Sequence, residues 1–378
     1  MRFASAARMC SQFTAVAMVL TSFVGTPSAL AATPVAQTPV LLVRAGSSRY
    51  FYVVTTSGCH ASVCLRMYRT NVDGTTFTRV STPPVASDHG GTAGTTLDRI
   101  VFANVDDGYA TVGTNSPSSL YVTTNGARTW RRVMRAKDLS ISIAVTSSEL
   151  FVTTVTCQPR SIVCSQYTTR RATLAATQWV TLPRLWKTGA GTNETYYGPS
   201  LAAYASTIWE LQTGPRTYLW ISHDRGRTFS RRSEKWPTLV SVSGCILTPM
   251  SVVSLWAQCP TGMEESFWHS GNGGDTWSPV SPDRFQFMGT GGGAFDPITS
   301  QMAVLDFGSV ARPPDLYRVS GGGRRFTPIG EVRCFNASPM AFTSASDGLM
   351  MCGLNVTTVL RRTNDGGATW VTVALPRA

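Results

Sequence analysis

Charged side chains are scarce in this chain of 378 residues. They make up 14% of it, whereas about 25% of the residues of a typical globular protein are charged. Hydrophobic residues make up 43% and aromatic residues 10%, which excludes an intrinsically disordered chain. The 33 glycines and 21 prolines, set among many serines and threonines, favour many short strands joined by turns over long helices.

Long apolar runs are also missing after the first thirty residues, so we expect no stable membrane insertion. The N-terminus itself is typical of a signal peptide. Arg2 and Arg8 precede an apolar run at residues 13–24, and Ala29-Leu30-Ala31 fits a signal peptidase site. We therefore expect residues 1–31 to be removed after Ala31 and the protein to be secreted. An uncleaved N-terminal anchor is the alternative.

Metal-binding spacings are absent. Eight of the nine cysteines follow the signal peptide, none of them forms a CxxC pair, and the four histidines are scattered. This excludes the usual zinc motifs, and no phosphate-binding glycine loop or haem motif is present. We expect neither a metal nor a cofactor. An even number of cysteines in an exported protein instead indicates disulfides.

A repeat of about 49 residues organises the rest of the chain. Residues 222–229 and 363–370 share the pattern Ser/Thr-x-Asp-x-Gly-x-Thr-aromatic, and residues 123–130 and 270–277 share it with Asn in the acidic position. Residues 70–77 keep the glycine, threonine and aromatic. With two weaker copies, the final aromatics fall at positions 77, 130, 179, 229, 277, 326 and 370. Repeats of this length, each holding four short strands, are the signature of a β-propeller.

The motif predicts a tight hairpin. An Asp or Asn side chain accepts hydrogen bonds from amides further along the turn, and the glycine supplies a positive φ. We therefore assign turn-forming roles to Asp224, Asn272, Asp365 and Asn125. A catalytic role for these side chains is disfavoured, because repeated hairpins cannot all face one active site.

These segments resemble the Asp-box, or bacterial neuraminidase repeat, families. Those families include sialidases, sortilin-type propellers, and the photosystem II assembly factor with its bacterial relatives. The resemblance covers roughly residues 40–375 and implies the propeller fold rather than one function. Residues 100–113 and 340–353 also read as strand, Asp-Gly turn and strand, a pattern common in the assembly-factor branch.

The predicted fold is thus all-β: a seven-bladed β-propeller of four-stranded antiparallel blades, with intra-blade disulfides. A linker at 32–39 precedes a single propeller at 40–378, with blades at about 40–82, 97–134, 141–183, 200–234, 240–281, 289–330 and 335–375. The strand order places the cysteines at the face opposite the boxes, which we call the top face. The predicted pairs are Cys59–Cys64, Cys157–Cys164, Cys245–Cys259 and Cys334–Cys352.

Two long top connections, 184–199 and 282–297, carry aromatic side chains beside polar ones. Trp186, Tyr196 and Phe285 are our candidates for ligand binding; folding of these loops over the central channel is the alternative. Arginine pairs flank several boxes, at 131/132, 231/232, 324/325 and 361/362. They fit either protection of strand edges or a basic rim that attracts anionic partners.

The sequence therefore predicts a secreted, non-catalytic binding or assembly module. We expect it to be a monomer that recognises a protein or an anionic cell-surface glycan on its top face, and not nucleic acid. The alternative is an Asp-box glycoside hydrolase of the exo-sialidase type, which needs two positioned carboxylates. Its catalytic candidates are Glu194, Tyr197 and Asp296, with Glu210 as a further carboxylate to test. The family's Arg-Ile-Pro signature is absent, and its propellers have six blades.

Overall fold

The structure is a computed structural model in which the chain divides into two units, Met1–Pro34 and Val35–Ala378. It describes residues 38–46, 49–59, 62–71, 73–85, 95–114, 118–136, 139–157, 164–183, 197–213, 217–232, 245–261, 264–280, 294–306, 315–332, 334, 339–354 and 357–376. The predicted signal peptide and linker therefore lie outside the described part, apart from residues 38 and 39. Within that part, no helix is long and apolar enough to span a membrane.

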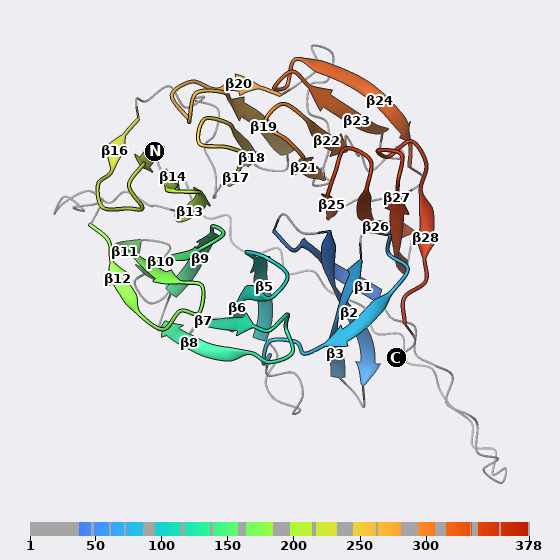
Figure 1. Cartoon of the computed structure of the whole chain (residues 1–378), viewed down its shortest axis with the longest axis horizontal. Coiled ribbons are helices and arrows are strands. Elements are labelled where there is room, and N and C mark those ends of the chain that lie inside the picture. The colour runs from blue at the N-terminus through green and yellow to red at the C-terminus, as the bar shows by residue number, and fades with distance from the viewer. Residues whose placement is uncertain are drawn as a thin grey trace, which may run out of the picture. The chain divides into compact units, whose positions relative to one another are not determined.

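The second unit is a β-propeller, in which seven four-stranded sheets surround a common centre (Figure 1). Each sheet consists of four consecutive antiparallel strands, so the predicted fold class is confirmed. Blade 1 contains β1 (Thr38–Arg44), β2 (Tyr50–Cys59), β3 (Ser62–Asn71) and β4 (Phe77–Val80); blade 2 contains β5 (Thr95–Phe102), β6 (Asp107–Thr114), β7 (Ser118–Thr124) and β8 (Arg131–Ala136); and blade 3 contains β9 (Leu139–Val145), β10 (Glu149–Cys157), β11 (Cys164–Thr173) and β12 (Trp179–Thr181). Blade 4 contains β13 (Tyr197–Tyr204), β14 (Thr207–Thr213), β15 (Tyr218–Ser222) and β16 (Ser230–Arg231), and blade 5 contains β17 (Ile246–Pro249), β18 (Leu255–Thr261), β19 (Glu264–Ser270) and β20 (Ser278–Pro279). Blade 6 contains β21 (Phe295–Pro297), β22 (Ala303–Asp306), β23 (Asp315–Ser320) and β24 (Arg325–Glu331), and blade 7 contains β25 (Met340–Phe342), β26 (Gly348–Leu354), β27 (Thr357–Thr363) and β28 (Val371–Val373).

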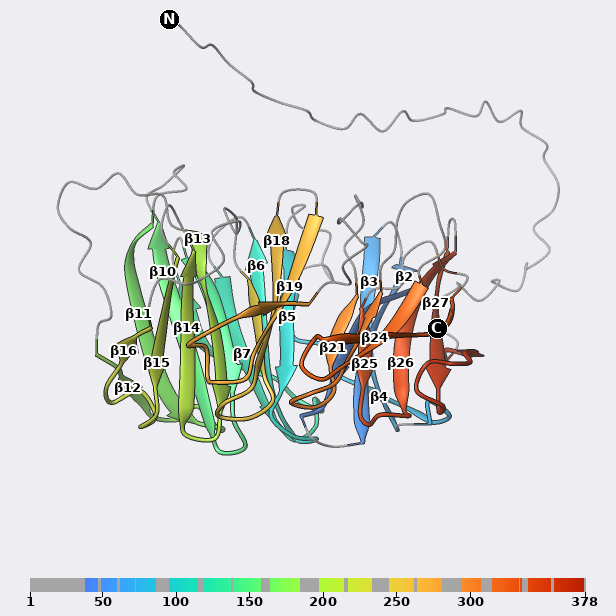
Figure 2. The same cartoon turned by 90° about the horizontal axis from the view of Figure 1, so that it is seen from above.

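The first strand of each blade is innermost and the fourth is outermost. The box hairpin, which joins the third and fourth strands, lies at the same end of the blade as the turn between the first and second. Backbone hydrogen bonds join the two turns in five blades, for example from Gly126 to Asp106 and from Gly273 to Val253. In Figure 2 these turns lie along the lower edge of the blades, and the opposite end is the top face.

Hydrophobic side chains fill the seams between blades. Successive residues of a strand point to opposite faces of its sheet, so one strand serves two seams. In β1, Leu42 packs against blade 7, whereas Val43 packs against blade 2. The buried apolar residues form seven clusters, one for each pair of neighbouring blades. The core is therefore a ring of packed seams.

Aromatic side chains on second strands also bind the next blade through their polar tips. The hydroxyl of Tyr52 donates to the carbonyl of Val105 at 2.6 Å, and that of Tyr109 donates to Leu174 at 2.7 Å. The indole of Trp209 donates to Gly273 at 2.9 Å. Each ring thus buries apolar surface in a seam while its one polar group is satisfied.

The ring closes without an exchanged strand, because blades 1 and 7 each consist of four consecutive strands. Closure depends on the apolar seam between them, where Leu42 and Phe51 of blade 1 meet Leu349 and Met351 of blade 7. The guanidinium of Arg44 also donates to a carbonyl of blade 7. Figure 1 shows β1 to β3 beside β25 to β28.

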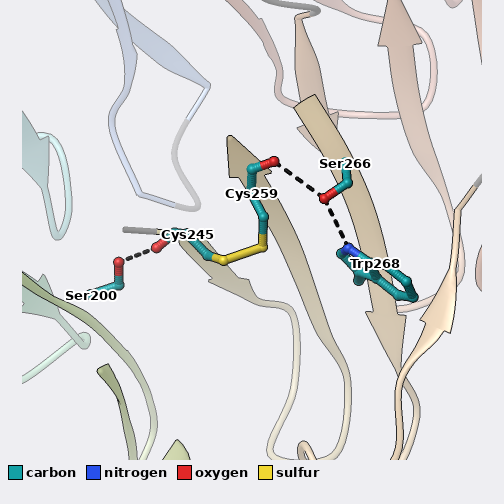
Figure 3. Close-up of a disulfide and its surroundings, with 5 residues drawn as sticks. All are labelled: Ser200, Cys245, Cys259, Ser266 and Trp268. Carbon is teal, nitrogen blue, oxygen red and sulfur yellow. Dashed lines mark hydrogen bonds between the residues drawn. A yellow bond between two sulfur atoms is a disulfide. The ribbon is translucent and has the colours of Figure 1, made fainter. Parts of the chain in front are cut away.

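Two of the predicted disulfides, Cys245–Cys259 and Cys334–Cys352, are confirmed, and each lies within one blade. Figure 3 shows the first, which is anchored by neighbouring polar groups. Ser200 of blade 4 donates to the Cys245 carbonyl, and Ser266 donates to the Cys259 carbonyl at 3.2 Å. Both disulfides lie near the top-face ends of their first and second strands.

The other two predicted pairs are only partly within the described part. Cys64 is disulfide-bonded, but the side chain of its predicted partner, Cys59, lies outside the described residues. The backbones of Cys157 and Cys164 face each other across β10 and β11, and their side chains also lie outside.

Candidate functional site

The four box hairpins share one hydrogen-bond pattern. In each, the Asp or Asn side chain accepts from the amide of the threonine four residues later, at 2.9 to 3.0 Å. A Ser or Thr two residues before it donates to the same side chain and accepts from the backbone of the turn. The capping residues are Asn125, Asp224, Asn272 and Asp365.

These bonds leave the two carboxylates poorly suited to acid–base chemistry. The hydroxyl of Thr369 donates to Asp365 at 2.6 Å, and together with the Thr369 amide it lowers the pKa of the Asp365 carboxyl to about 2. The equivalent bonds from Thr228 lower the pKa of Asp224. Both side chains remain ionised at any ordinary pH and stabilise their hairpins.

Blade 1 departs from this pattern. Asn71, one position earlier than the motif predicts, accepts from the amides of Thr75 and Thr76 at 3.2 and 3.4 Å. The hairpin is therefore capped by a displaced residue. The local sequence offers the signal, since the expected capping position is Val72.

Arginines in or beside the boxes bind neighbouring blades. Arg131 donates to the carbonyl of Ala175 at 2.8 Å, and Arg232 forms an ion pair with Asp275 at 3.1 Å. Arg225 occupies a left-handed position (φ 60°) where the other three capped hairpins have glycine. This backbone conformation is unfavourable for a residue other than glycine. The Arg225 guanidinium lies 3.7 Å from the Glu149 carboxylate of blade 3, so the same residue also forms an ion pair between blades.

The first strands of neighbouring blades are linked by polar contacts around the centre of the ring. Asp296 of blade 6 accepts from the amide of Phe342 of blade 7 at 2.5 Å. Arg44 of blade 1 donates to the carbonyl of the same Phe342 at 2.6 Å. Both backbone groups of Phe342 are thus bound by charged side chains of the two adjacent blades. Burial raises the pKa of the Asp296 carboxyl to about 6, against the opposing effect of Arg44.

Glu210 lies in a second buried polar group, between blades 3 and 4. It is 1% exposed, accepts from the hydroxyl of Thr169 at 2.9 Å, and accepts from the amide of Gln212 at 3.4 Å. Thr169 also shares a hydrogen bond with Thr153. Burial raises the pKa of Glu210, because desolvation disfavours its ionised form.

Ser254 and His269 form a buried pair that could be mistaken for a catalytic one. Their side chains lie 3.2 Å apart, and both contact the carbonyl of Ser300 in blade 6. The imidazole packs on Trp256, and burial lowers its pKa. This pair therefore connects blades 5 and 6 rather than facing solvent.

The other sequence candidates are not brought together by the described structure. Glu194, Trp186, Tyr196 and Phe285 lie outside the described residues. Tyr197 begins β13 opposite Thr213, and its side chain is also outside. Asp296 binds backbone, as given above. In the described part of the chain, no group of three or more His, Cys, Asp or Glu side chains could hold a metal ion.

Sequence reasoning missed the role of Arg44 and the contacts of Phe342. The only signal was a charged residue ending the otherwise apolar strand TPVLLVR. Their meeting depends on the closure of the ring, which no local pattern encodes.

No protein-family model matches the chain, and a search of curated proteins finds no relative. Solved structures do match. YCF48 from Cyanidioschyzon merolae is 14% identical, with a TM-score of 0.50 over 75% of this chain and 86% of its own. The β-propeller domain of the Trilobed protease from Pyrococcus furiosus, described as having an open velcro topology, is 10% identical, with a TM-score of 0.55 over 90% and 96%. Oligogalacturonate lyase from Vibrio parahaemolyticus is 8% identical, with a TM-score of 0.52 over 90% and 92%.

At these identities the similarity establishes the β-propeller fold alone.

Proposed function

We propose that this protein is an exported, non-catalytic binding module of the Asp-box type that recognises a protein or an anionic glycan on its top face. The observation that carries the proposal is the placement of Cys245–Cys259 and Cys334–Cys352 at the top-face ends of their blades. Each disulfide lies against a packed seam. A face stiffened in this way can present loops to a ligand with little loss of conformational entropy.

Hydrogen bonds to four carboxylates also support a non-catalytic module. Asp224, Asp365, Asp296 and Glu210 each accept hydrogen bonds that join turns or blades. A glycoside hydrolase needs two carboxyl groups that face one sugar and remain free to exchange protons with it. The four carboxyl groups named above instead accept hydrogen bonds from other groups of the protein.

Binding and catalysis can be tested side by side. The labelled protein is applied to an array of anionic glycans and peptides, and a triple variant (Trp186→Ala, Tyr196→Ala, Phe285→Ala) is compared with Val371→Ala, an exposed control on an outer strand. We expect the triple variant alone to lose binding. Equal binding by both variants would overturn the top-face assignment, and hydrolysis of a fluorogenic sialoside that fails in Asp296→Asn would overturn the non-catalytic one.

A further inference from the structure

The outer half of blade 2 carries positive charge with no negative charge beside it. The residues that form β7, β8 and their hairpin include Arg128, Arg131, Arg132 and Arg135, all exposed, and no acid. The acids described in blade 2 (Asp98, Asp106 and Asp107) lie on its two inner strands or the turn between them. Blade 5 is the opposite case: its outer half carries Glu264, Glu265 and Asp275 and no arginine.

Protection of strand edges does not account for this distribution. Every blade has an outermost strand with the same exposed edge, and charged residues there discourage pairing with another sheet. Yet β12, β20 and β28, the outermost strands of blades 3, 5 and 7, carry no charge at all. Edge protection predicts charge on all seven strands, whereas three arginines are gathered on β8 alone.

The pairing of β8 with β7 shows which face of the sheet each arginine occupies. Arg131 pairs with Val122 and binds the Ala175 carbonyl of blade 3, so it has a structural partner. Arg132 pairs with Tyr121 and Arg135 pairs with Ser119. Tyr121 packs into the seam with blade 1, so Arg132 and Arg135 both lie on the blade 1 side. Their pairing positions are two residues apart along β7, which is about 7 Å.

Arg128, Arg132 and Arg135 have no anionic partner within the part of the chain that the structure describes, where the ion pairs involve other arginines. Arg128 lies on the hairpin that leads into β8, and its carbonyl is held by Ser81 of blade 1 at 2.7 Å. The backbone that carries these three side chains is therefore fixed. We call Arg128, Arg132 and Arg135 the arginine strip.

We infer that the arginine strip is a second binding surface, distinct from the top face, and that its ligand is a linear acidic polysaccharide. Guanidinium groups bind carboxylate and sulfate groups through paired hydrogen bonds, and anions repeated along a chain match side chains repeated along a strand. Strand β8 offers no exposed apolar or aromatic anchor, which a protein partner would need. The neighbouring aromatic side chains, Tyr121 and Trp130, both pack against the seam with blade 1, and the Trp130 indole donates to Ser81, so neither stands free to stack with single-stranded nucleic acid.

The test uses the purified protein and immobilised polygalacturonate, with heparin and DNA as competing polyanions. Arg132→Gln/Arg135→Gln is compared with Arg324→Gln/Arg325→Gln, which removes the same charge from exposed positions of blade 6. We expect the first pair to weaken polysaccharide binding at least about tenfold and to reduce the slope of log affinity against log salt by about 1 to 2. The control should stay within about twofold.

Three results would overturn the inference: no binding to either polysaccharide, equal weakening by both variants, or tighter binding to DNA that depends on Arg132 and Arg135. The thermal unfolding midpoint of each variant verifies that it is folded. The strip does not depend on the top-face proposal. Polysaccharide binding that survives the variant of Trp186, Tyr196 and Phe285 but is lost in the strip variant would support the strip alone.

Discussion

Asp296 and Arg44, which lie in blades 6 and 1, bind opposite sides of one residue, Phe342 of blade 7. The carboxylate accepts from the Phe342 amide and the guanidinium donates to its carbonyl. Because blades 1 and 7 share no strand, the Arg44 contact joins the two ends of the propeller through polar groups in addition to the apolar seam. Asp296 binds the same residue from blade 6 and so links a third blade to this contact.

Replacement of Asp296 by Asn should change how stability depends on pH. The pKa of Asp296 is raised to about 6 in the folded protein, whereas an unfolded Asp titrates near 4. The folded state therefore binds the proton more tightly, and wild-type stability should fall relative to Asp296→Asn as pH rises from about 4 to about 6. The full change is on the order of 2 kcal/mol. Guanidinium unfolding at pH 3.5, 5 and 7.5 measures it, and a constant difference across this range would contradict the prediction.

Two replacements of Asp365 distinguish how much its hydrogen bonds and its charge each contribute to stability. Asp365→Ala removes the acceptor for Thr369 and Thr363 and should destabilise the protein by about 1 kcal/mol. Asp365→Asn should cost less, because Asn125 and Asn272 cap equivalent hairpins.

The stability difference between the wild type and Asp365→Asn should also depend on pH. The pKa of Asp365 is lowered to about 2, so the advantage of the wild type over Asp365→Asn should be complete above about pH 4 and disappear as pH falls through 2. Equal unfolding free energies for the Ala and Asn variants at pH 7 would contradict the capping role.

Removal of the Cys334–Cys352 disulfide should destabilise blade 7. The bridge closes a loop with a sequence separation of 18, for which the chain-entropy model gives about 3 kcal/mol. Chemical unfolding of Cys334→Ala/Cys352→Ala against the wild type measures the loss. Peptide mapping without reduction should also find Cys59–Cys64 and Cys157–Cys164. A bridge between different blades would show that the pairing by blade is wrong.

Glu210→Gln should stabilise the protein at neutral pH by about 1 kcal/mol or more, because it removes a charge that burial disfavours. Glutamine can still accept from Thr169. Since the folded pKa of Glu210 is raised, wild-type stability should fall relative to the variant as pH rises above about 4.3, the unfolded value. Thermal unfolding from pH 4 to pH 8 tests this, and a wild type more stable than the variant at pH 8 would contradict it.

Much of the fold could be predicted because its information is repeated along the chain. The final aromatics of the repeats recur about every 49 residues, and each capped hairpin depends on contacts within five residues, such as Thr228 to Asp224. The two confirmed cysteine pairs could be assigned for the same reason, since each lies within one blade. The displaced cap at Asn71 escaped prediction because its hairpin breaks the shared spacing.

The contacts between blades could not be predicted in this way. Asp296 and Phe342 are 46 residues apart, and Arg44 and Phe342 are 298 apart. Each of these residues belongs to a different repeat, so their meeting depends on how the blades are placed around the ring. The arginine pair at 131/132 makes the same point, because its two members face different neighbouring blades.

The amino-acid sequence by itself determined the all-β class, the seven repeats, the capped hairpins and the pairs Cys245–Cys259 and Cys334–Cys352, since all of these arise from interactions between residues near in sequence. Only the tertiary structure decided which charges join blades, which acids have a pKa raised by burial, and which arginines remain without an anionic partner among the described residues. The physical reason is that burial and charge pairing depend on neighbours brought together by the closed ring, and these neighbours lie in other repeats.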